Sequence, residues 1–147
     1  SFLAYQQKFE YMFVLSKGKP TTINLIRDRK NKYIETRRIK KRQPDGTFKE
    51  QIIKTPKYGV RYNYWTYNTG KGHSTKDEIA FNHPAIFPEN LARDHIISWS
   101  REGDTILDPF AGSGTTLKVA RELNRSFIGI EISEEYVEII KERLKKC

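Results

Sequence analysis

Ile106-Leu-Asp-Pro-Phe-Ala-Gly-Ser-Gly-Thr-Thr-Leu117, followed by Ser126-Phe-Ile-Gly-Ile-Glu131, is the stretch that decides the fold of this chain. The short apolar run at residues 105–107 predicts a buried parallel strand, which Asp108 and Pro109 end. Gly112 and Gly114 let the backbone turn sharply and approach a ligand closely, because they carry no side chain. The stretch therefore opens with a strand that leads into a glycine-rich turn.

A helix and a second strand follow this turn. Leu117, Ala120 and Leu123 recur at a spacing of three, which places them on one face of a helix. Residues 126–130 form a second apolar strand that ends at Glu131. Strand, turn, helix and strand make half of a doubly wound α/β unit, in which the helix N-terminus attracts an anion and a carboxylate at the strand tip accepts from ribose hydroxyls.

Two phosphate-binding motifs are excluded. The third glycine of the dinucleotide fingerprint is absent, because Lys118 and its neighbours are not glycine, and no Lys-Ser or Lys-Thr follows a glycine at the spacing of a phosphate-cradling loop. A ligand with a ribose and a modest anion remains, and S-adenosylmethionine fits that description. The alternative is a structural unit whose glycines only form the turn and whose Glu131 caps the next helix.

Three segments resemble a known family, the exocyclic-amino DNA methyltransferases, which methylate the amino nitrogen of adenine or cytosine. These are Asp108-Pro-Phe-Ala-Gly-Ser-Gly-Thr-Thr, Ile128-Gly-Ile-Glu131 and, upstream, His83-Pro-Ala-Ile-Phe-Pro-Glu-Asn-Leu91. Their order is similar to that of the permuted β-class, and Glu10-Tyr-Met-Phe-Val-Leu-Ser-Lys17 resembles a late core strand of that class. The resemblance implies a partial Rossmann-like S-adenosylmethionine methyltransferase fold with an inserted, β-rich, basic target-recognition region.

The resemblance also implies three parts and a cofactor site. Residues 1–17 would be the late core strand, 18–75 the target-recognition region and 76–147 the cofactor-binding portion. We expect the backbone N–H groups of residues 113–115 to bind the carboxylate of the cofactor and Glu131 to accept hydrogen bonds from its ribose hydroxyls. Phe110 would pack on the apolar flank of the cofactor, and His83 would fix a local turn. The expected cofactor-binding residues are Asp108, Pro109, Phe110, Gly112, Ser113, Gly114, Thr115 and Glu131, with Pro84, Ala85 and Phe87 closing the methionine end.

Positive charge is concentrated in one segment. Residues 17–61 hold fifteen Lys or Arg against four acids, an excess of +11, whereas the other 102 residues carry 12 basic and 14 acidic groups. Such a concentration is typical of a surface that binds a polyanion, and the resemblance implies that this polyanion is double-stranded DNA. The expected DNA-binding residues are Arg37, Arg38, Lys40, Lys41, Arg42, Arg61, Tyr64 and Trp65, with Tyr62 and Tyr67 nearby. The alternative is a solvated basic hairpin beside an aromatic strand that packs in the core.

The catalytic motif of the family is absent from this sequence. The family holds the acceptor base with an Asp, Asn or Ser followed by Pro-Pro and an aromatic residue, but none of the six prolines here is adjacent to another. We therefore assign no catalytic residue and interpret the chain as the C-terminal portion of a longer methyltransferase, inactive alone. The alternatives are a catalytically inactive DNA-binding module or accessory subunit, and an enzyme that acts on RNA or a small molecule. The choice between adenine and cytosine stays open.

Composition sets the remaining expectations. At 37% hydrophobic and 31% charged residues the chain is typical of a globular domain, and no apolar run approaches the roughly 20 residues of a membrane span. The single cysteine, Cys147, suggests a reducing compartment, so we expect a cytoplasmic protein. The resemblance implies a prokaryotic or phage-type, nucleoid-associated protein from a restriction-modification or orphan modification system. His and Cys have no metal-ligand spacing, so no metal is assigned. Open sheet edges favour self-association.

The other expected elements follow from local patterns. These are a buried strand at residues 11–15, a short extended piece at 21–26, a hairpin over 32–55 around Pro44-Asp45-Gly46, a strand at 60–67, a helix from Pro88 through Trp99, and a last helix that starts at Ser133.

Overall fold

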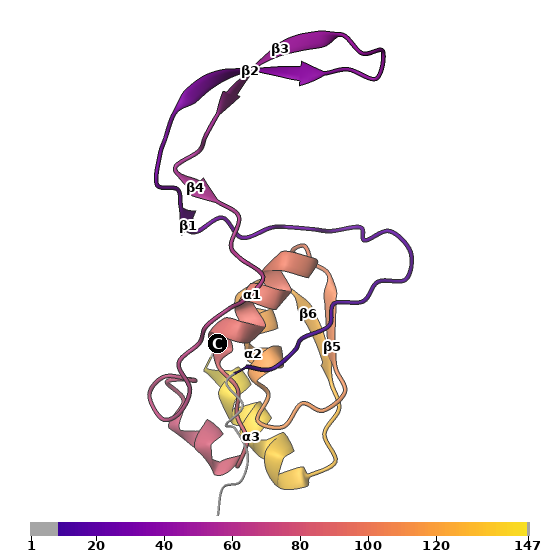
Figure 1. Cartoon of the computed structure of the whole chain (residues 1–147). Helices are drawn as coiled ribbons and strands as arrows, with labels where there is room; N and C mark the ends of the chain where they lie inside the picture. Colours follow the sequence, from indigo (N-terminus) through magenta and orange to yellow (C-terminus); the bar gives the residue numbers. More distant parts are fainter. Residues whose placement is uncertain (1–8, 147) are drawn as a thin grey trace, which may run out of the picture.

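The computed structural model describes residues 9–146 and divides into an α/β core and an arm that projects from it (Figure 1). The arm contains β1 (Arg29–Lys30), β2 (Thr36–Arg42), β3 (Phe48–Lys54) and β4 (Tyr58–Gly59). The core contains the short 3-10 helix η1 (Glu78–Asn82), α1 (Glu89–Trp99), β5 (Thr105–Asp108), α2 (Thr115–Glu122), β6 (Ser126–Gly129) and α3 (Glu134–Lys145).

The core is built on the predicted strand–turn–helix–strand unit. β5 and β6 pair in parallel, with Ile106 opposite Phe127, and α2 forms the crossover between them. Ile106 and Phe127 pack on the apolar cluster that α1 and α2 share, which includes Ile96 and Val119. The predicted helix face is confirmed, since Leu117 and Ala120 are buried and Leu123 packs on the same cluster.

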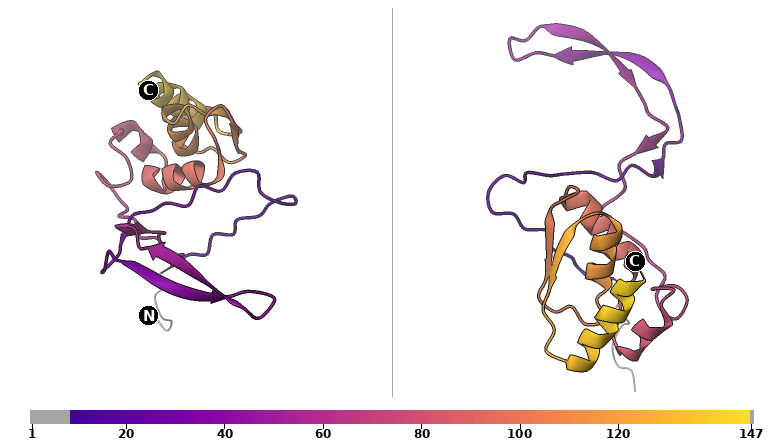
Figure 2. Two further views of the ribbon diagram at one scale, coloured as in Figure 1. Left: turned by 90° about the horizontal axis from the view of Figure 1, so that it is seen from above. Right: turned by 180° about the vertical axis from the view of Figure 1, so that it is seen from behind.

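The opposite face of this sheet is open, which corrects the predicted burial of the strand at residues 105–107. Leu107 is 60% exposed and Ile128 is 56% exposed, because successive side chains of a strand point to opposite faces and all three core helices pack on one side or end of the pair (Figure 2). A parallel sheet is normally covered on both faces, so two strands alone leave half of their apolar side chains in solvent.

Local signals account for the ends of the helices. α1 begins at Glu89, directly after Pro88, and α3 has Ser133 as its N-cap, whose Oγ accepts from the backbone N–H of Tyr136 at 3.4 Å. α2 has Gly114 as its N-cap in the left-handed conformation. The helices predicted from Pro88 and from Ser133 are therefore confirmed.

The arm consists of a stem and a ribbon. The stem is the β1–β4 pair, and the ribbon is the antiparallel β2–β3 pair, which confirms the predicted hairpin. Within the turn, Oδ1 of Asp45 accepts from the backbone N–H of Thr47 at 2.9 Å and from its hydroxyl at 2.7 Å. Both views of Figure 2 show the ribbon standing clear of the core.

Two predicted strands are wrong. Residues 11–15 form no strand, and Phe13 and Leu15 are 83% and 90% exposed, because no strand within residues 9–146 pairs with this segment. Residues 60–67 form no strand either, because the stem strand β4 ends at Gly59. The extended piece at 21–26 is not a strand either, although Asn24 N–H donates to the carbonyl of Ser98 at 2.8 Å. Residues 1–8 of the expected late core strand lie outside the described residues.

Candidate functional site

The glycine turn between β5 and α2 depends on the absence of two side chains. Gly112 has a φ of 52° and Gly114 a φ of 77°, both in the left-handed region that favours glycine. A Cβ on Gly112 would lie 3.0 Å from Nε2 of His83, and one on Gly114 would lie 2.8 Å from Cγ1 of Ile140. The turn is therefore pressed between the segment at residue 83 and helix α3.

Glu131 joins the tip of β6 to this turn. Its Oε2 accepts from the backbone N–H of Gly112 at 2.7 Å, and its Oε1 accepts from the N–H of Ser133 at 3.0 Å. These two hydrogen bonds, that of Ser133 first, hold the pKa of Glu131 below its ordinary value. Glu131 thus fixes the start of α3, as the structural alternative expected, and lies at the glycine turn, as a ribose-binding carboxylate must.

The other predicted residues of the turn divide by exposure. Asp108 accepts from the N–H of Phe110 at 3.1 Å, and the ring of Phe110 is 88% exposed. Pro109 is also exposed, whereas Ser113 and Thr115 are buried at the start of α2. The N–H of Gly114 donates to Ala111 at 2.7 Å, so one of the three amides expected to face the cofactor is used within the turn.

The upstream segment meets the turn through His83. Its ring packs against Tyr136 of α3 at a centroid distance of 4.4 Å, and its Nδ1 accepts from the N–H of Ala85 at 3.1 Å. His83 therefore fixes the local turn, as predicted. Pro84 and Ala85 are exposed beside it, and Phe87 is 39% exposed.

A buried ion cluster lies beneath the turn, and sequence reasoning missed it. It consists of Thr75, Asp77, Glu89, Lys118 and Arg143. The Arg143 side chain is fully buried, with Nε 3.1 Å from Oδ2 of Asp77 and Nη2 2.7 Å from Oε1 of Glu89. Lys118 Nζ lies 2.8 Å from the same two oxygens. The cluster holds two cations and two carboxylates, so its charges balance.

Arg143 ties this cluster to the glycine turn. Its Nη1 donates to the carbonyl of Ser113 at 2.7 Å and to Oγ1 of Thr115 at 3.2 Å. Burial is the largest influence on the pKa of Asp77 and raises it, but the hydrogen bonds and charges of Lys118 and Arg143 outweigh burial, so the pKa lies below its ordinary value. One signal was visible in the sequence, because Arg143 falls between buried apolar positions of α3.

The ribbon carries five of the predicted DNA-binding residues on exposed strand positions. They are Arg37, Arg38, Lys40, Lys41 and Arg42. They sit together on β2, as the basic run predicted. Phe48 and Ile52 of β3 are 66% and 64% exposed beside them.

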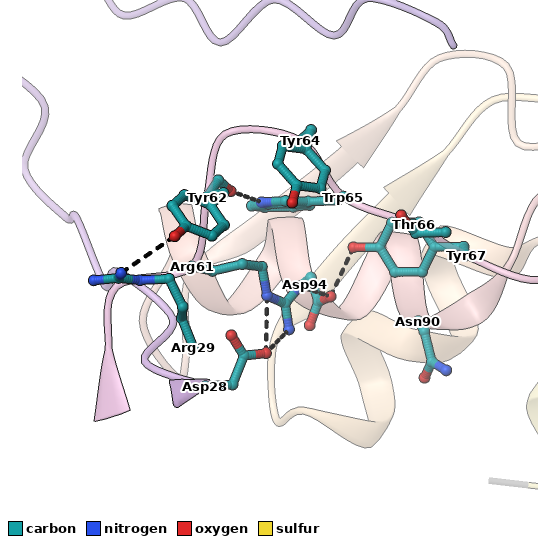
Figure 3. Close-up of a pocket in the computed structure, with 10 residues that line it drawn as sticks. All are labelled: Asp28, Arg29, Arg61, Tyr62, Tyr64, Trp65, Thr66, Tyr67, Asn90 and Asp94. Carbon is teal, nitrogen blue, oxygen red and sulfur yellow. Dashed lines mark hydrogen bonds and ion pairs between the residues drawn. The ribbon is translucent and has the colours of Figure 1, made fainter. Parts of the chain in front are cut away.

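Arg61 differs from this group, because its guanidinium is paired inside the protein (Figure 3). Its Nη2 lies 2.5 Å from Oδ2 of Asp28 and its Nη1 2.5 Å from Oδ2 of Asp94, and its side chain is only 24% exposed. The hydrogen bond to Asp28, followed by that to Asp94, holds the pKa of Arg61 above its ordinary value. Arg61 therefore joins the stem to α1, and a phosphate would have to compete with two carboxylates for it.

The aromatic residues around Arg61 line an open hollow of about 560 Å³ between stem and α1 (Figure 3). Trp65 is partly buried, packs on His95 at 4.8 Å between ring centroids and donates its Nε1–H to the carbonyl of Tyr62 at 2.9 Å. Tyr67 donates to Asp94 at 2.7 Å. Tyr64 is 71% exposed and stacks on Tyr62, so these two rings are the ones that face solvent.

Comparison with known proteins shows the family to which this chain belongs. A family profile described as DNA methylase, of the N6/N4 methyltransferase type, matches residues 3–142. This chain belongs to the N6/N4 DNA methylase family. The orphan methyltransferase M.BamHII of Bacillus amyloliquefaciens is 55% identical over 148 residues, which cover 96% of this chain and 55% of that protein. The type II methyltransferase M.SmaI of Serratia marcescens is 35% identical over 135 residues, which cover 92% of this chain and 37% of that protein.

A solved structure agrees with this assignment. The cytosine-N4-specific PvuII DNA methyltransferase matches with a TM-score of 0.51 and 27% identity, over 57% of this chain and 32% of that one. This DNA methylase chain thus spans about half or less of the length of the curated relatives above. Within residues 9–146, no helix is long and apolar enough to cross a membrane, and no cluster of His, Cys, Asp and Glu is arranged to hold a metal ion.

Proposed function

We propose that this chain is the cofactor-binding and DNA-binding portion of a DNA amino-methyltransferase, which transfers a methyl group from S-adenosylmethionine to the exocyclic amino group of adenine or cytosine. In the longer methyltransferase, residues 1–17 would become the late core strand by pairing with a strand outside this chain, while 18–75 are the target-recognition region and 76–147 the cofactor site. One observation carries the proposal: the carboxylate of Glu131, at the tip of β6, is bonded to the backbone of the glycine turn at Gly112.

The residues at the turn fit S-adenosylmethionine. A carboxylate has about four lone-pair sites, and the two hydrogen bonds that Glu131 accepts leave sites for ribose hydroxyls. The amide of Ser113 in the turn, the amide of Thr115 at the start of α2 and the helix dipole favour the carboxylate of the cofactor. The exposed ring of Phe110 offers apolar area. When bound, the cofactor supplies an electrophilic methyl group.

This chain's own residues bind and orient the cofactor, and none of them is assigned to methyl transfer. The Pro-Pro-aromatic motif of the family, which holds the acceptor base, is absent from the sequence. An accessory subunit that binds DNA without methylating it is the second candidate, and the projecting ribbon favours it. The cofactor titration below distinguishes the two.

Calorimetric titration of the chain with S-adenosylmethionine tests the proposal, with Asp108→Ala and Glu131→Ala as site variants. Glu138→Ala is the matched control, because Glu138 is an exposed acid on α3 with a 67% exposed side chain. We expect saturable binding by the parent chain and the control, and its loss in both site variants. Binding that survives both substitutions would sink the proposal. A folded parent chain that does not bind is retested with the upstream part of the methyltransferase restored, and continued failure favours the accessory subunit.

We further propose that the DNA partner is double-stranded and that the protein works in the bacterial cytoplasm beside the nucleoid. The family profile is that of a DNA methylase and the relatives named above are bacterial methyltransferases, which supports both statements. We also propose self-association through the open edges of the two-stranded β5–β6 sheet. Sedimentation velocity over a range of concentrations tests it, and a constant monomeric coefficient argues against it.

A further inference from the structure

The two faces of the ribbon are set by its register. Side chains alternate between faces along a strand, and residues opposite each other across the ribbon share a face. The register pairs Arg37 with Ile53, Ile39 with Gln51 and Lys41 with Lys49, which defines face A. Face B consists of Thr36, Arg38, Lys40, Arg42, Phe48, Glu50, Ile52 and Lys54.

The ribbon divides its charge equally between these faces. Face A carries three cations, Arg37, Lys41 and Lys49, and no acid. Face B carries four cations and one acid, Glu50, which lies directly opposite Lys40. Each face therefore has a net charge of +3. All of these charged side chains are exposed. Just before β2, Glu35 lies 3.8 Å from Arg37, an exposed pair that is worth little.

Neither face packs against the core. Only Ile39 and Ile53, diagonal neighbours on face A, are half-buried, and every other side chain of the two strands is exposed. A two-stranded ribbon with both faces in water is marginally stable at best. The ribbon therefore gains order from a partner that covers both faces rather than one.

The charge distribution limits the ways in which DNA can bind the ribbon. A ribbon that lay flat across one phosphate backbone would need its cations on one face only. Equal charge on both faces suits a site with anions on both sides, as in a groove bounded by two phosphate strands. The major groove is about 12 Å wide and admits a two-stranded ribbon, whereas the minor groove is only about 6 Å wide. Packed sheets lie about 10 Å apart, so a ribbon with its side chains is about 10 Å thick from face to face, a thickness that fits the major groove.

We propose that the ribbon enters the DNA major groove edgewise, with face A toward one phosphate strand and face B toward the other. The turn at residues 43–47 and the strand edges then meet the base edges, while the two faces position the protein. This inference rests on the proposed function, since it requires DNA as the partner. It assigns phosphate contacts to Lys49 and Lys54 of β3, in addition to the cations of β2.

Two matched triple variants test this arrangement. Arg37→Gln, Lys41→Gln and Lys49→Gln neutralise face A, and Arg38→Gln, Arg42→Gln and Lys54→Gln neutralise face B while keeping the opposed Lys40 and Glu50. The control is Lys141→Gln, Lys145→Gln and Lys146→Gln, which removes the same charge from exposed positions of α3 and its C-cap. Fluorescence anisotropy with a labelled duplex gives the affinity of each chain over a range of salt concentrations.

The slope of log K against log salt is negative, and each phosphate contact contributes about 0.9 to its magnitude. We expect each face variant to decrease that magnitude by about 2–3, because each variant removes three cations. The α3 control is expected to keep the parent slope. A decrease confined to one face would overturn edgewise insertion while leaving DNA binding intact. No decrease in either variant would remove the ribbon from the DNA interface altogether, and with it that part of the proposed function.

A second measurement tests the groove. In a duplex whose cytosines carry glucosylated 5-hydroxymethyl groups, the sugars fill the major groove and leave the phosphates unchanged. We expect the parent chain to bind this duplex more weakly than the unmodified one. Equal affinity for the two duplexes would overturn the assignment to the major groove.

Discussion

Replacing Arg143 with Met removes the cation that holds four segments together beneath the glycine turn. The side chain is fully buried and contacts Asp77, Glu89, Ser113 and Thr115. Removing one partner of a buried ion pair costs about 3–5 kcal/mol, because the remaining charge stays buried without its partner. Lys118 still lies 2.8 Å from both carboxylates, so we place the loss at the lower end, about 3 kcal/mol.

Urea unfolding followed by circular dichroism measures this loss. With a urea dependence of about 2 kcal/mol per M, a loss of about 3 kcal/mol moves the midpoint down by about 1.5 M. Arg143→Lys keeps the charge but loses the planar fork, so it is expected to fall between the parent and Arg143→Met. Lys141→Met on the same helix is the control, because Lys141 makes only an exposed pair with Glu138. Arg143→Met behaving like Lys141→Met would refute the reasoning.

Three further predictions concern the cluster, the turn and the stem. Because the pKa of Asp77 is lowered in the folded chain, this carboxylate stabilises the fold at pH values above its ordinary pKa of 3.8, and the stabilisation is lost as the pH falls through its folded pKa. The free energy of unfolding is therefore expected to decrease from about pH 5 to pH 2, and to decrease less steeply in Asp77→Asn. At Gly112 the φ is 52° and a Cβ would lie 3.0 Å from Nε2 of His83, so Gly112→Ala is expected to cost about 1–3 kcal/mol of stability and to weaken cofactor binding in calorimetry. The control is Gly103→Ala, which has a φ of 85° and open space around the Cβ, so it is expected to strain the backbone but to keep the affinity for the cofactor. Arg61→Met loses the joint to α1 and costs about 1–2 kcal/mol in urea unfolding, and an unchanged midpoint would contradict that role.

The sequence predicted the elements whose signals are local. The glycine turn, α2 and β6 followed from an apolar period and two glycines within a short stretch, and the N-cap at Ser133 followed from a hydroxyl before two acids. The hairpin followed from Pro44-Asp45-Gly46. The helices and the hairpin form their defining hydrogen bonds within themselves, and β6 pairs with β5 across the single helix α2, so a pattern within a short stretch is sufficient.

The misses depend on partners that are distant in sequence. Residues 11–15 have the composition of a strand, but a strand needs a neighbour for its backbone hydrogen bonds. From the sequence Arg61 was predicted to be a free cation, because its partners Asp28 and Asp94 are each 33 residues away. Arg143 bonds to Asp77 across 66 residues. Charge patterns in a sequence count such residues as surface charges, since only the folded chain shows which carboxylates they meet.

The stem has a consequence for how relatives can diverge. β1 and β4 place Arg29 opposite Gly59 and Lys30 opposite Tyr58, so the chain leaves and re-enters the stem at adjacent positions, about 4.8 Å apart. An insertion with adjacent ends is tolerated because it does not displace the host backbone. Residues 31–57 can therefore be exchanged, lengthened or transplanted between homologues without repacking the glycine turn. Under the proposed function, choice of DNA sequence and binding of the methyl donor can then be inherited as separate traits.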